Sequence, residues 1–177
     1  MSINRGKQFE GIIESAFKSV PNTTIVRLHD QTTGFKGSVN PCDFIVFHRP
    51  YMYAIECKSV HGNTFPLSNI TDNQWNKLLE MSKTPGVISG VICWWVDRDE
   101  TLFIPAITLK NVRDRNGKSI RFDAYTTTDI CGRIHGTKKR VFFEYDMERF
   151  MKEAEDWYDR QQSIDYTGAS RKRLPQH

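Results

Sequence analysis

The sequence lacks the signals of a membrane protein, a disulfide framework or a zinc centre. No stretch approaches 18 consecutive apolar residues, and residues 1–10 (MSINRGKQFE) lack the apolar core of a signal peptide. The four cysteines show no C-x-x-C spacing, and three of them lie inside apolar runs, where a free thiol packs as a small hydrophobic group. We therefore expect no membrane segment, no structural zinc or disulfides, and by default a cytoplasmic location.

The sequence also has only a small excess of positive over negative charge. Lysine and arginine total 25 against 21 acidic residues, so the net charge is +4. This balance is compatible with nucleic-acid binding but does not require it. The basic clusters at 138–140 (KKR) and 171–173 (RKR) are suggestive, although solvated surface charge explains either one at least as well.

Apolar periodicity predicts an α/β fold, a mixed β-sheet flanked by helices. We expect helices at 4–19, 71–83 and 146–162, strands at 23–30, 87–96 and 100–106, a hairpin within 40–59, and a further hairpin or edge strand within 132–145. The length of 177 residues and the lack of internal repeats predict one domain, 1–162. The remaining polar and basic residues, 163–177, are expected to form a flexible tail.

The hairpin NPCDFIVFHRPYMYAIECKS (40–59) carries charge at an unusual place. If its turn lies between Arg49 and Pro50, paired positions sum to 99, so that Asp43 faces Glu56. Period-two alternation then puts Lys58 on the same face as Glu56. Two carboxylates and an ammonium group are therefore expected to gather at the end of the ribbon away from its turn.

The two carboxylates would repel each other by about 3 kcal/mol at an effective dielectric constant near 20. A shared proton, the Lys58 ammonium group or a divalent cation could offset this repulsion. Hard oxygen ligands with an open side suit Mg²⁺, which can activate water and neutralise charge on a phosphate. On the hairpin alone, a surface ion pair of little energetic value explains the pattern equally well.

The neighbouring motifs make the pattern more specific. Asp43 followed by Glu-x-Lys in IECK is similar to the signature of the PD-(D/E)XK nuclease superfamily. NRGKQFE (4–10) resembles the opening motif of RecU-type Holliday junction resolvases, and TFPLSNITDNQ (64–74) resembles the segment that follows Glu-x-Lys in that family. LFIPA (102–106) falls where the family has its later strand. The resemblance covers roughly 4–110, in the family's order.

The resemblance implies a restriction-endonuclease-like fold and roles for individual residues. Asp43 and Glu56 would be metal ligands, Lys58 the catalytic lysine, and Glu10 the helix carboxylate that completes the metal site. Gln74 resembles the family glutamine near the active site, although a capping box with Thr71 explains it almost as well. Mg²⁺ is the implied cofactor, with Mn²⁺ as a possible substitute, and the implied location is a bacterial cytoplasm, or that of the host cell if the protein is phage-encoded.

Residues in three segments of the chain are expected to contact DNA. Asn4, Arg5 and Lys7 lie at a predicted helix N-terminus, which favours phosphate, although plain capping is the alternative. Lys36 lies in a glycine-flanked loop. The later hairpin contributes a set of basic side chains that are expected to contact the DNA backbone: Arg133, Lys138, Lys139 and Arg140.

The sequence departs from the family before Asp43. RecU-type enzymes carry a long basic insertion there, a stalk that reaches into the junction, whereas this chain has only LHDQTTGFKGSVNPC (28–42). Junction selectivity is therefore less firmly indicated than nuclease chemistry.

The leading hypothesis is a Mg²⁺-dependent endonuclease that resolves four-way DNA junctions by paired nicks in recombination and repair. The two-fold symmetry of a junction implies a homodimer, whose interface could use the Trp94–Trp95 strand or the C-terminal helix. The alternatives are a restriction or repair endonuclease of the same fold and a catalytically silent DNA-binding module.

Overall fold

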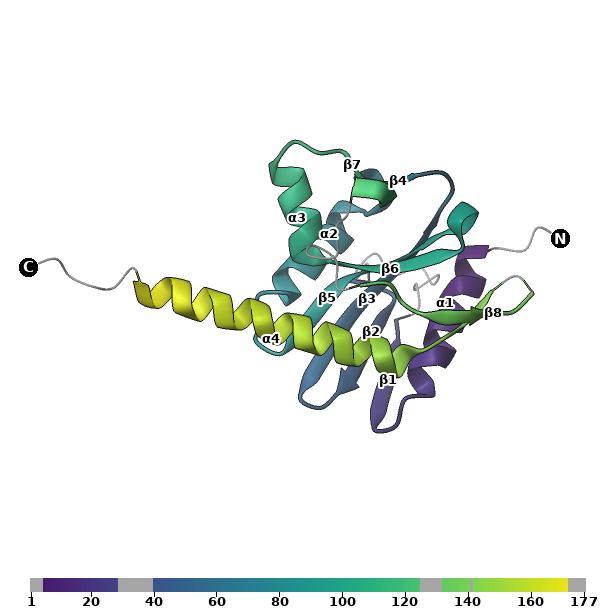
Figure 1. Cartoon of the computed structure of the whole chain (residues 1–177), viewed down its shortest axis with the longest axis horizontal. Helices are drawn as coiled ribbons and strands as arrows, with labels where there is room; N and C mark the ends of the chain where they lie inside the picture. Colours follow the sequence, from purple (N-terminus) through teal and green to yellow (C-terminus); the bar gives the residue numbers. More distant parts are fainter. Residues whose placement is uncertain (1–4, 29–39, 125–131, 141, 172–177) are drawn as a thin grey trace, which may run out of the picture.

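A five-stranded mixed sheet forms the centre of the protein (Figure 1). The computed structural model describes residues 5–28, 40–124, 132–140 and 142–171. The strand order is β1-β2-β3-β5-β6, and only β3 and β5 pair in parallel. The bounds of these strands are β1 Thr23–Arg27, β2 Phe44–His48, β3 Tyr51–Val60, β5 Val87–Trp95 and β6 Glu100–Pro105.

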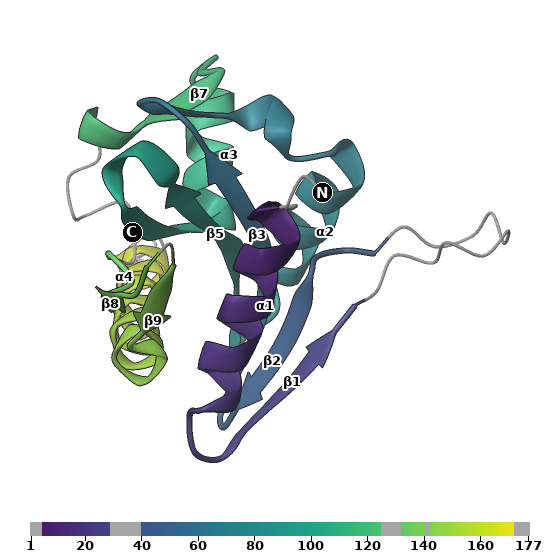
Figure 2. The same ribbon diagram turned by 90° about the vertical axis from the view of Figure 1, so that its right-hand side faces the viewer.

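Helices cover both faces of this sheet. On one face, α1 (Arg5–Lys18) and α4 (Met147–Arg171) enclose an aromatic-rich core that includes Phe9 and Phe150. On the other face, α2 (Asp72–Met81) and α3 (Ala106–Asp114) bury a second core. Figure 2 shows α1 running along the sheet, with α4 seen nearly end-on beside it. The predicted α/β class is confirmed.

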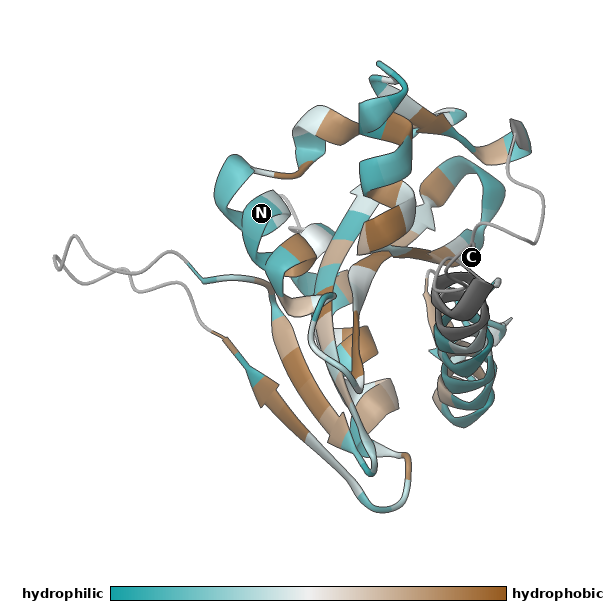
Figure 3. Cartoon of the chain, turned by 90° about the vertical axis from the view of Figure 1, so that its left-hand side faces the viewer, coloured by the Kyte–Doolittle hydropathy of each residue, from teal (hydrophilic) through white to brown (hydrophobic). Residues whose placement is uncertain are grey.

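The apolar pattern of the sequence explains these two layers. Every residue of β5 is buried, as expected of an interior strand that is apolar on both faces. The apolar stripe of α1 is buried as predicted, at Phe9, Ile13, Ala16, Phe17 and Val20. Figure 3 shows hydrophobic residues along the strands of the sheet, and the coloured part of α4 is mostly hydrophilic.

Smaller elements complete the chain. Two short strand pairs lie outside the main sheet, β4 (Thr64–Pro66) with β7 (Ser119–Arg121), and β8 (Gly136–Lys138) with β9 (Phe143–Tyr145). The β8–β9 pair is the further hairpin predicted within 132–145. Three 3₁₀ turns are formed by η1 (Leu67–Asn69), η2 (Val96–Arg98) and η3 (Phe122–Ala124).

Helix α3 was not predicted from the sequence. It begins directly after Pro105 without a side-chain N-cap, and it buries only Ala106, Thr108 and Leu109. A nine-residue helix with so small an apolar face has little periodicity to distinguish it from a loop.

The C-terminal helix is longer than predicted. It continues through Arg171, past the expected end at 162, so the first part of the predicted tail is helical. No proline lies between the start of α4 and Pro175, so the helical hydrogen bonds are not interrupted. Beyond residue 162 the sequence has no apolar face from which the continuation of the helix could be predicted. Residues 172–177 lie outside the described residues.

The expected dimer contact through Trp94 and Trp95 is not supported. Strand β5 lies between β3 and β6, and both tryptophan side chains are buried within their own subunit, at 2% and 0% exposure. The cysteines described, Cys42, Cys57 and Cys93, are free and buried, as their apolar surroundings predicted. In the described part of the chain, no helix combines the length and the hydrophobicity needed to cross a bilayer.

Candidate active site

The β2–β3 hairpin brings the predicted acids and lysine together. Phe47 pairs with Met52 and Phe44 with Ile55, which is the predicted register. Asp43 continues this register, since its backbone N–H donates to the carbonyl oxygen of Ile55 at 3.0 Å. The carboxylate of Asp43 accepts a hydrogen bond from the backbone N–H of Cys57 at 2.7 Å and therefore lies beside the Glu-x-Lys motif.

Glu56 is the buried centre of this cluster. Its Oε1 atom lies 2.7 Å from the Nζ atom of Lys58, and the Glu56 side chain is 2% exposed while that of Lys58 is 24% exposed. The Oε2 atom of Glu56 is buried and has no hydrogen-bond partner in the part of the chain that the structure describes. A buried carboxylate oxygen without a partner is costly unless another group satisfies it.

The surroundings of Glu56 shift its protonation. Burial and the nearby charge of Asp43 raise the pKa of Glu56 from 4.5 to about 7, although the Lys58 ammonium group acts in the opposite direction. The carboxylate is therefore held close to its protonation point near neutral pH. A bound cation would lower this pKa and stabilise the ionised form.

Helix α2 adds Gln74 to the cluster. Thr71 and Gln74 form the predicted capping box, in which the Gln74 amide oxygen accepts from the Thr71 backbone N–H at 3.1 Å. The amide nitrogen of the same side chain donates to Glu56 Oε1 at 2.6 Å. The capping box is therefore confirmed, and the same amide group also contacts the buried acid, while a role of Gln74 in catalysis stays a prediction.

Glu10 approaches from α1 but has a different partner. Its Oε2 atom is in a short contact with the guanidinium group of Arg27, whose other amino group lies 3.1 Å from Glu14. Burial and the charge of Asp43 raise the pKa of Glu10, and the cations of Arg27, Lys7 and Lys58 oppose this effect. Glu10 thus lies within electrostatic reach of Asp43.

The donor set fits a divalent cation held by two carboxylates. Asp43 and Glu56 supply hard oxygen ligands, and the partnerless Oε2 atom of Glu56 is satisfied if a cation binds there. Among the described residues, no group of three or more histidine, cysteine or acidic side chains is close enough to hold a metal ion. The third predicted ligand, Glu10, is therefore not gathered with the other two acids.

The predicted DNA-binding residues divide into two groups. Arg5 and Lys7 lie in the first turns of α1, the helix that carries Glu10. Three basic side chains around β8 form ion pairs, Arg133 with Glu100 at 3.0 Å, Lys138 with Asp99, and Lys139 with Glu144 at 2.9 Å. Arg140 is exposed, and Asn4 and Lys36 lie outside the described residues.

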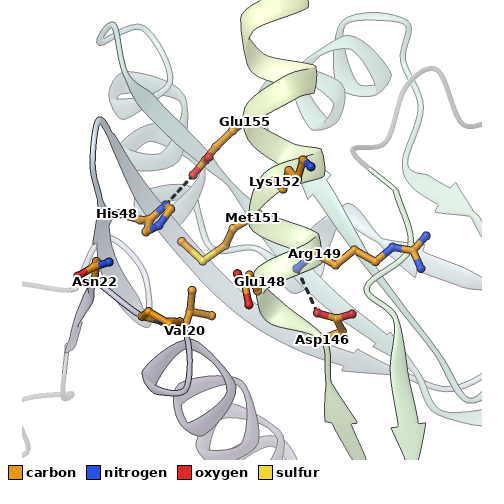
Figure 4. Close-up of a pocket in the computed structure, with 10 residues that line it drawn as sticks. Val20, Asn22, His48, Asp146, Glu148, Arg149, Met151, Lys152 and Glu155 are labelled. Atoms are coloured by element: carbon orange, nitrogen blue, oxygen red, sulfur yellow. Dashed lines mark hydrogen bonds and ion pairs between the residues drawn. The ribbon is translucent and has the colours of Figure 1, made fainter.

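A cavity of about 550 Å³ lies at the opposite end of the hairpin (Figure 4). It is lined by His48, at the turn end of β2, and by α4 residues including Arg149 and Glu155. Glu155 accepts hydrogen bonds from Tyr53 at 2.6 Å and contacts His48 Nδ1 at 3.0 Å. These polar contacts anchor α4 to the sheet, and the cavity is separate from the acidic cluster.

Sequence reasoning did not identify Arg27 as part of the site. Its partner Glu10 lies 17 residues away, and no motif links the two positions. The available signal was weak: Arg27 is the one cation within the predicted strand 23–30, which precedes the segment that carries Asp43.

The fold and the acidic cluster define the class of the protein. A mixed sheet flanked by helices, with Asp43, Glu56 and Lys58 at one end of its hairpin, is that of an endonuclease with the restriction-endonuclease-like fold. The model of the family described as Recombination protein U (RecU) matches residues 4–140, which is most of the chain. The chain therefore belongs to the RecU family of Holliday junction resolvases.

A solved structure is also similar. Hjc, a Holliday junction resolvase from the archaeal hyperthermophile Archaeoglobus fulgidus, is 18% identical, and the match covers 59% of this chain and 75% of that one with a TM-score of 0.43. No curated protein sequence matches significantly.

Proposed function

We propose that the protein is a Mg²⁺-dependent endonuclease that resolves four-way DNA junctions by paired nicks. The observation that carries this proposal is the cluster at Glu56, a buried carboxylate with one oxygen bonded to Lys58 and Gln74 and the other without a partner. Membership of the RecU family supports a branched DNA substrate.

Asp43 and Glu56 would hold the cation, with Glu10 as the expected third carboxylate. When bound, the cation supplies Lewis acidity and neutralises charge at the scissile phosphate, and Mn²⁺ is the expected substitute. Gln74 and Lys58 fix Oε1 of Glu56, which leaves Oε2 for the ion. The partly exposed ammonium group of Lys58 is placed to orient the attacking water or to stabilise the phosphate.

The two-fold symmetry of a four-way junction supports a dimeric assembly. One acidic cluster per chain can cut one strand, and a junction needs two nicks related by its two-fold axis. We therefore expect the active species to be a homodimer that binds the junction with one cluster on each of two opposed strands. Arg5 and Lys7 are expected to contact the phosphate backbone next to Glu10.

A cleavage assay tests this proposal. The protein is incubated with a mobile four-way junction, a matched linear duplex and a flap, each with Mg²⁺ and with chelator. We expect symmetric nicks confined to the junction and no cleavage in chelator. Asp43→Asn should reduce the rate by about two orders of magnitude or more while leaving junction binding in chelator intact.

A second candidate is a restriction or repair endonuclease of the same fold. The short and nearly uncharged segment 28–42 favours it, because this segment replaces the family's long basic insertion. Equal cleavage of junction and linear duplex would support this candidate and contradict junction resolution. Unchanged activity of Asp43→Asn would contradict both enzymatic proposals.

A further inference from the structure

Arg27 is held in a fixed position next to the acidic cluster. Its guanidinium group contacts Glu10 and Glu14, which lie one helical turn apart on α1, and its Cζ atom is 5.6 Å from the centroid of the Phe44 ring. Arg27 and Phe44 are also paired in the sheet. The next backbone N–H, that of Leu28, donates to the Asp43 carbonyl oxygen at 2.8 Å. The backbone therefore ties Arg27 to the segment that carries Asp43.

Arg27 provides Glu10 with the positive charge that a metal would otherwise provide. Each acid of the proposed centre has a partner from the chain: Arg27 for Glu10, Lys58 for Glu56, and the Cys57 backbone N–H for Asp43. Among the described residues, Glu10 does not form a metal-binding group of three with Asp43 and Glu56, and its carboxylate contacts Arg27. A cation that recruits Glu10 must compete with the guanidinium group.

A DNA phosphate is the ligand best suited to bind the Arg27 guanidinium group in place of Glu10. The planar guanidinium group matches the geometry of phosphate as well as that of carboxylate, and it binds both through paired hydrogen bonds. Arg27 is partly accessible, with 23% of its side chain exposed. It also lies on the strand that leads to Asp43, beside the helix that carries Arg5 and Lys7.

We propose that Arg27 is a positioning residue that keeps Glu10 out of the metal centre until a DNA phosphate draws the guanidinium group away. This inference rests on the proposed function and adds to it a means by which DNA binding regulates metal binding. Because binding free energies are linked reciprocally, phosphate binding at Arg27 strengthens metal binding, and metal binding at Glu10 strengthens DNA binding.

A purely structural role makes a different prediction. If Arg27 only ties α1 to β1, its removal lowers the stability of the protein and either weakens metal binding or leaves it unchanged. Under the proposal, its removal strengthens metal binding, because a competing cation is lost. The direction of the change therefore separates the two roles.

The test measures Mn²⁺ affinity in the absence of DNA by calorimetric titration, and junction affinity in chelator by gel shift. Arg27→Gln should bind Mn²⁺ about fivefold more tightly than the unmodified protein, because a nearby positive charge is removed. The same variant should bind the junction more weakly. Arg27→Lys, which keeps the charge but loses the paired hydrogen bonds, should lie between the two proteins in both measurements.

Two further variants make the test specific. Lys18→Gln removes a positive charge from α1, the helix that carries Glu10. Lys18 binds Glu14 at 2.7 Å rather than Glu10, so the Mn²⁺ affinity of this variant should not change. In a Glu10→Gln background, Arg27→Gln should no longer strengthen Mn²⁺ binding. Thermal unfolding of each variant confirms that the comparison is made between folded proteins, and Arg27→Lys serves if Arg27→Gln does not fold.

The outcomes separate this inference from the proposed function. If the unmodified protein binds no Mn²⁺, both the metal-dependent function and the inference are wrong. If it binds Mn²⁺ and the Arg27 variants bind no more tightly, the inference is overturned while the proposed function stands. Tighter Mn²⁺ binding that persists in the Glu10→Gln background would also overturn it.

Discussion

The protonation of Glu56 couples the stability of the protein to its catalytic cluster. The carboxylate is buried beside Asp43, which favours its neutral form, and Lys58 offsets this only in part. A group that binds its proton more tightly in the folded state stabilises the protein fully at low pH. As the pH rises from 4.5 through about 7, ionisation of Glu56 removes that contribution.

We therefore predict a loss of stability over this pH range. The free energy of unfolding, measured by denaturant titration without metal, should fall by about 1–3 kcal/mol more in the unmodified protein than in Glu56→Gln. The glutamine has the same size and does not titrate. Parallel pH profiles for the two proteins would show that Glu56 has an ordinary pKa. Adding Mg²⁺ should restore stability at high pH in the unmodified protein alone.

At the scale of elements, α2 connects its capping box with the acidic cluster. The oxygen of the Gln74 amide closes the capping box, and its nitrogen holds Glu56. A substitution can therefore remove one role and keep the other.

We predict that one substitution at this cap lowers mainly the cleavage rate and another lowers mainly the stability of the protein. Gln74→Glu keeps an acceptor for the capping box but replaces the donor to Glu56 with a negative charge, so the cleavage rate should fall about 10- to 100-fold. Thr71→Ala should cost about 1 kcal/mol of stability with a much smaller effect on the rate. Single-turnover cleavage and thermal unfolding measure the two quantities. Equal rates for both variants would show that Gln74 is only a capping residue.

Local patterns predicted the elements that depend on local interactions. The turn at Arg49-Pro50 and strand alternation gave the pairing of β2 with β3, and Thr71 with Gln74 gave the start of α2. The partner of Glu10 could not be predicted, because the contact with Arg27 depends on how α1 packs against β1. Helix α3 was missed for a related reason: its burial depends on tertiary contacts rather than on a periodic apolar face.

At the scale of the whole molecule, we expect the basic residues around β8 and those at the start of α1 to contribute unequally to DNA binding. Lys138 and Lys139 are paired with Asp99 and Glu144, so their charge is balanced by their own surface. Arg5 and Lys7 belong to α1, the helix that carries Glu10, and the charge of Lys7 acts on Glu10. The net charge of +4 therefore does not indicate which surface binds the phosphate backbone.

We predict that the salt dependence of junction binding reveals this difference. Binding should weaken steeply with salt, and Arg5→Gln and Lys7→Gln should each reduce the slope of log K against log salt by about one. Lys138→Gln and Lys139→Gln are the matched controls and should change the slope much less. Gel shifts in chelator over a range of salt concentrations measure these slopes. A larger effect at the β8 residues would place the DNA at the β8–β9 hairpin rather than at the start of α1.

The parallel pairing of β3 with β5 has a consequence for how this enzyme can diversify. Glu56, Lys58 and Gln74 all lie within the single crossover unit that this pairing closes, whereas Glu10 and Arg27 come from the N-terminal helix and strand. Asp43, the other proposed metal ligand, precedes β2 and lies outside this unit. Substitutions in the N-terminal helix and strand are therefore expected to change the proposed control without altering Glu56, Lys58 or Gln74.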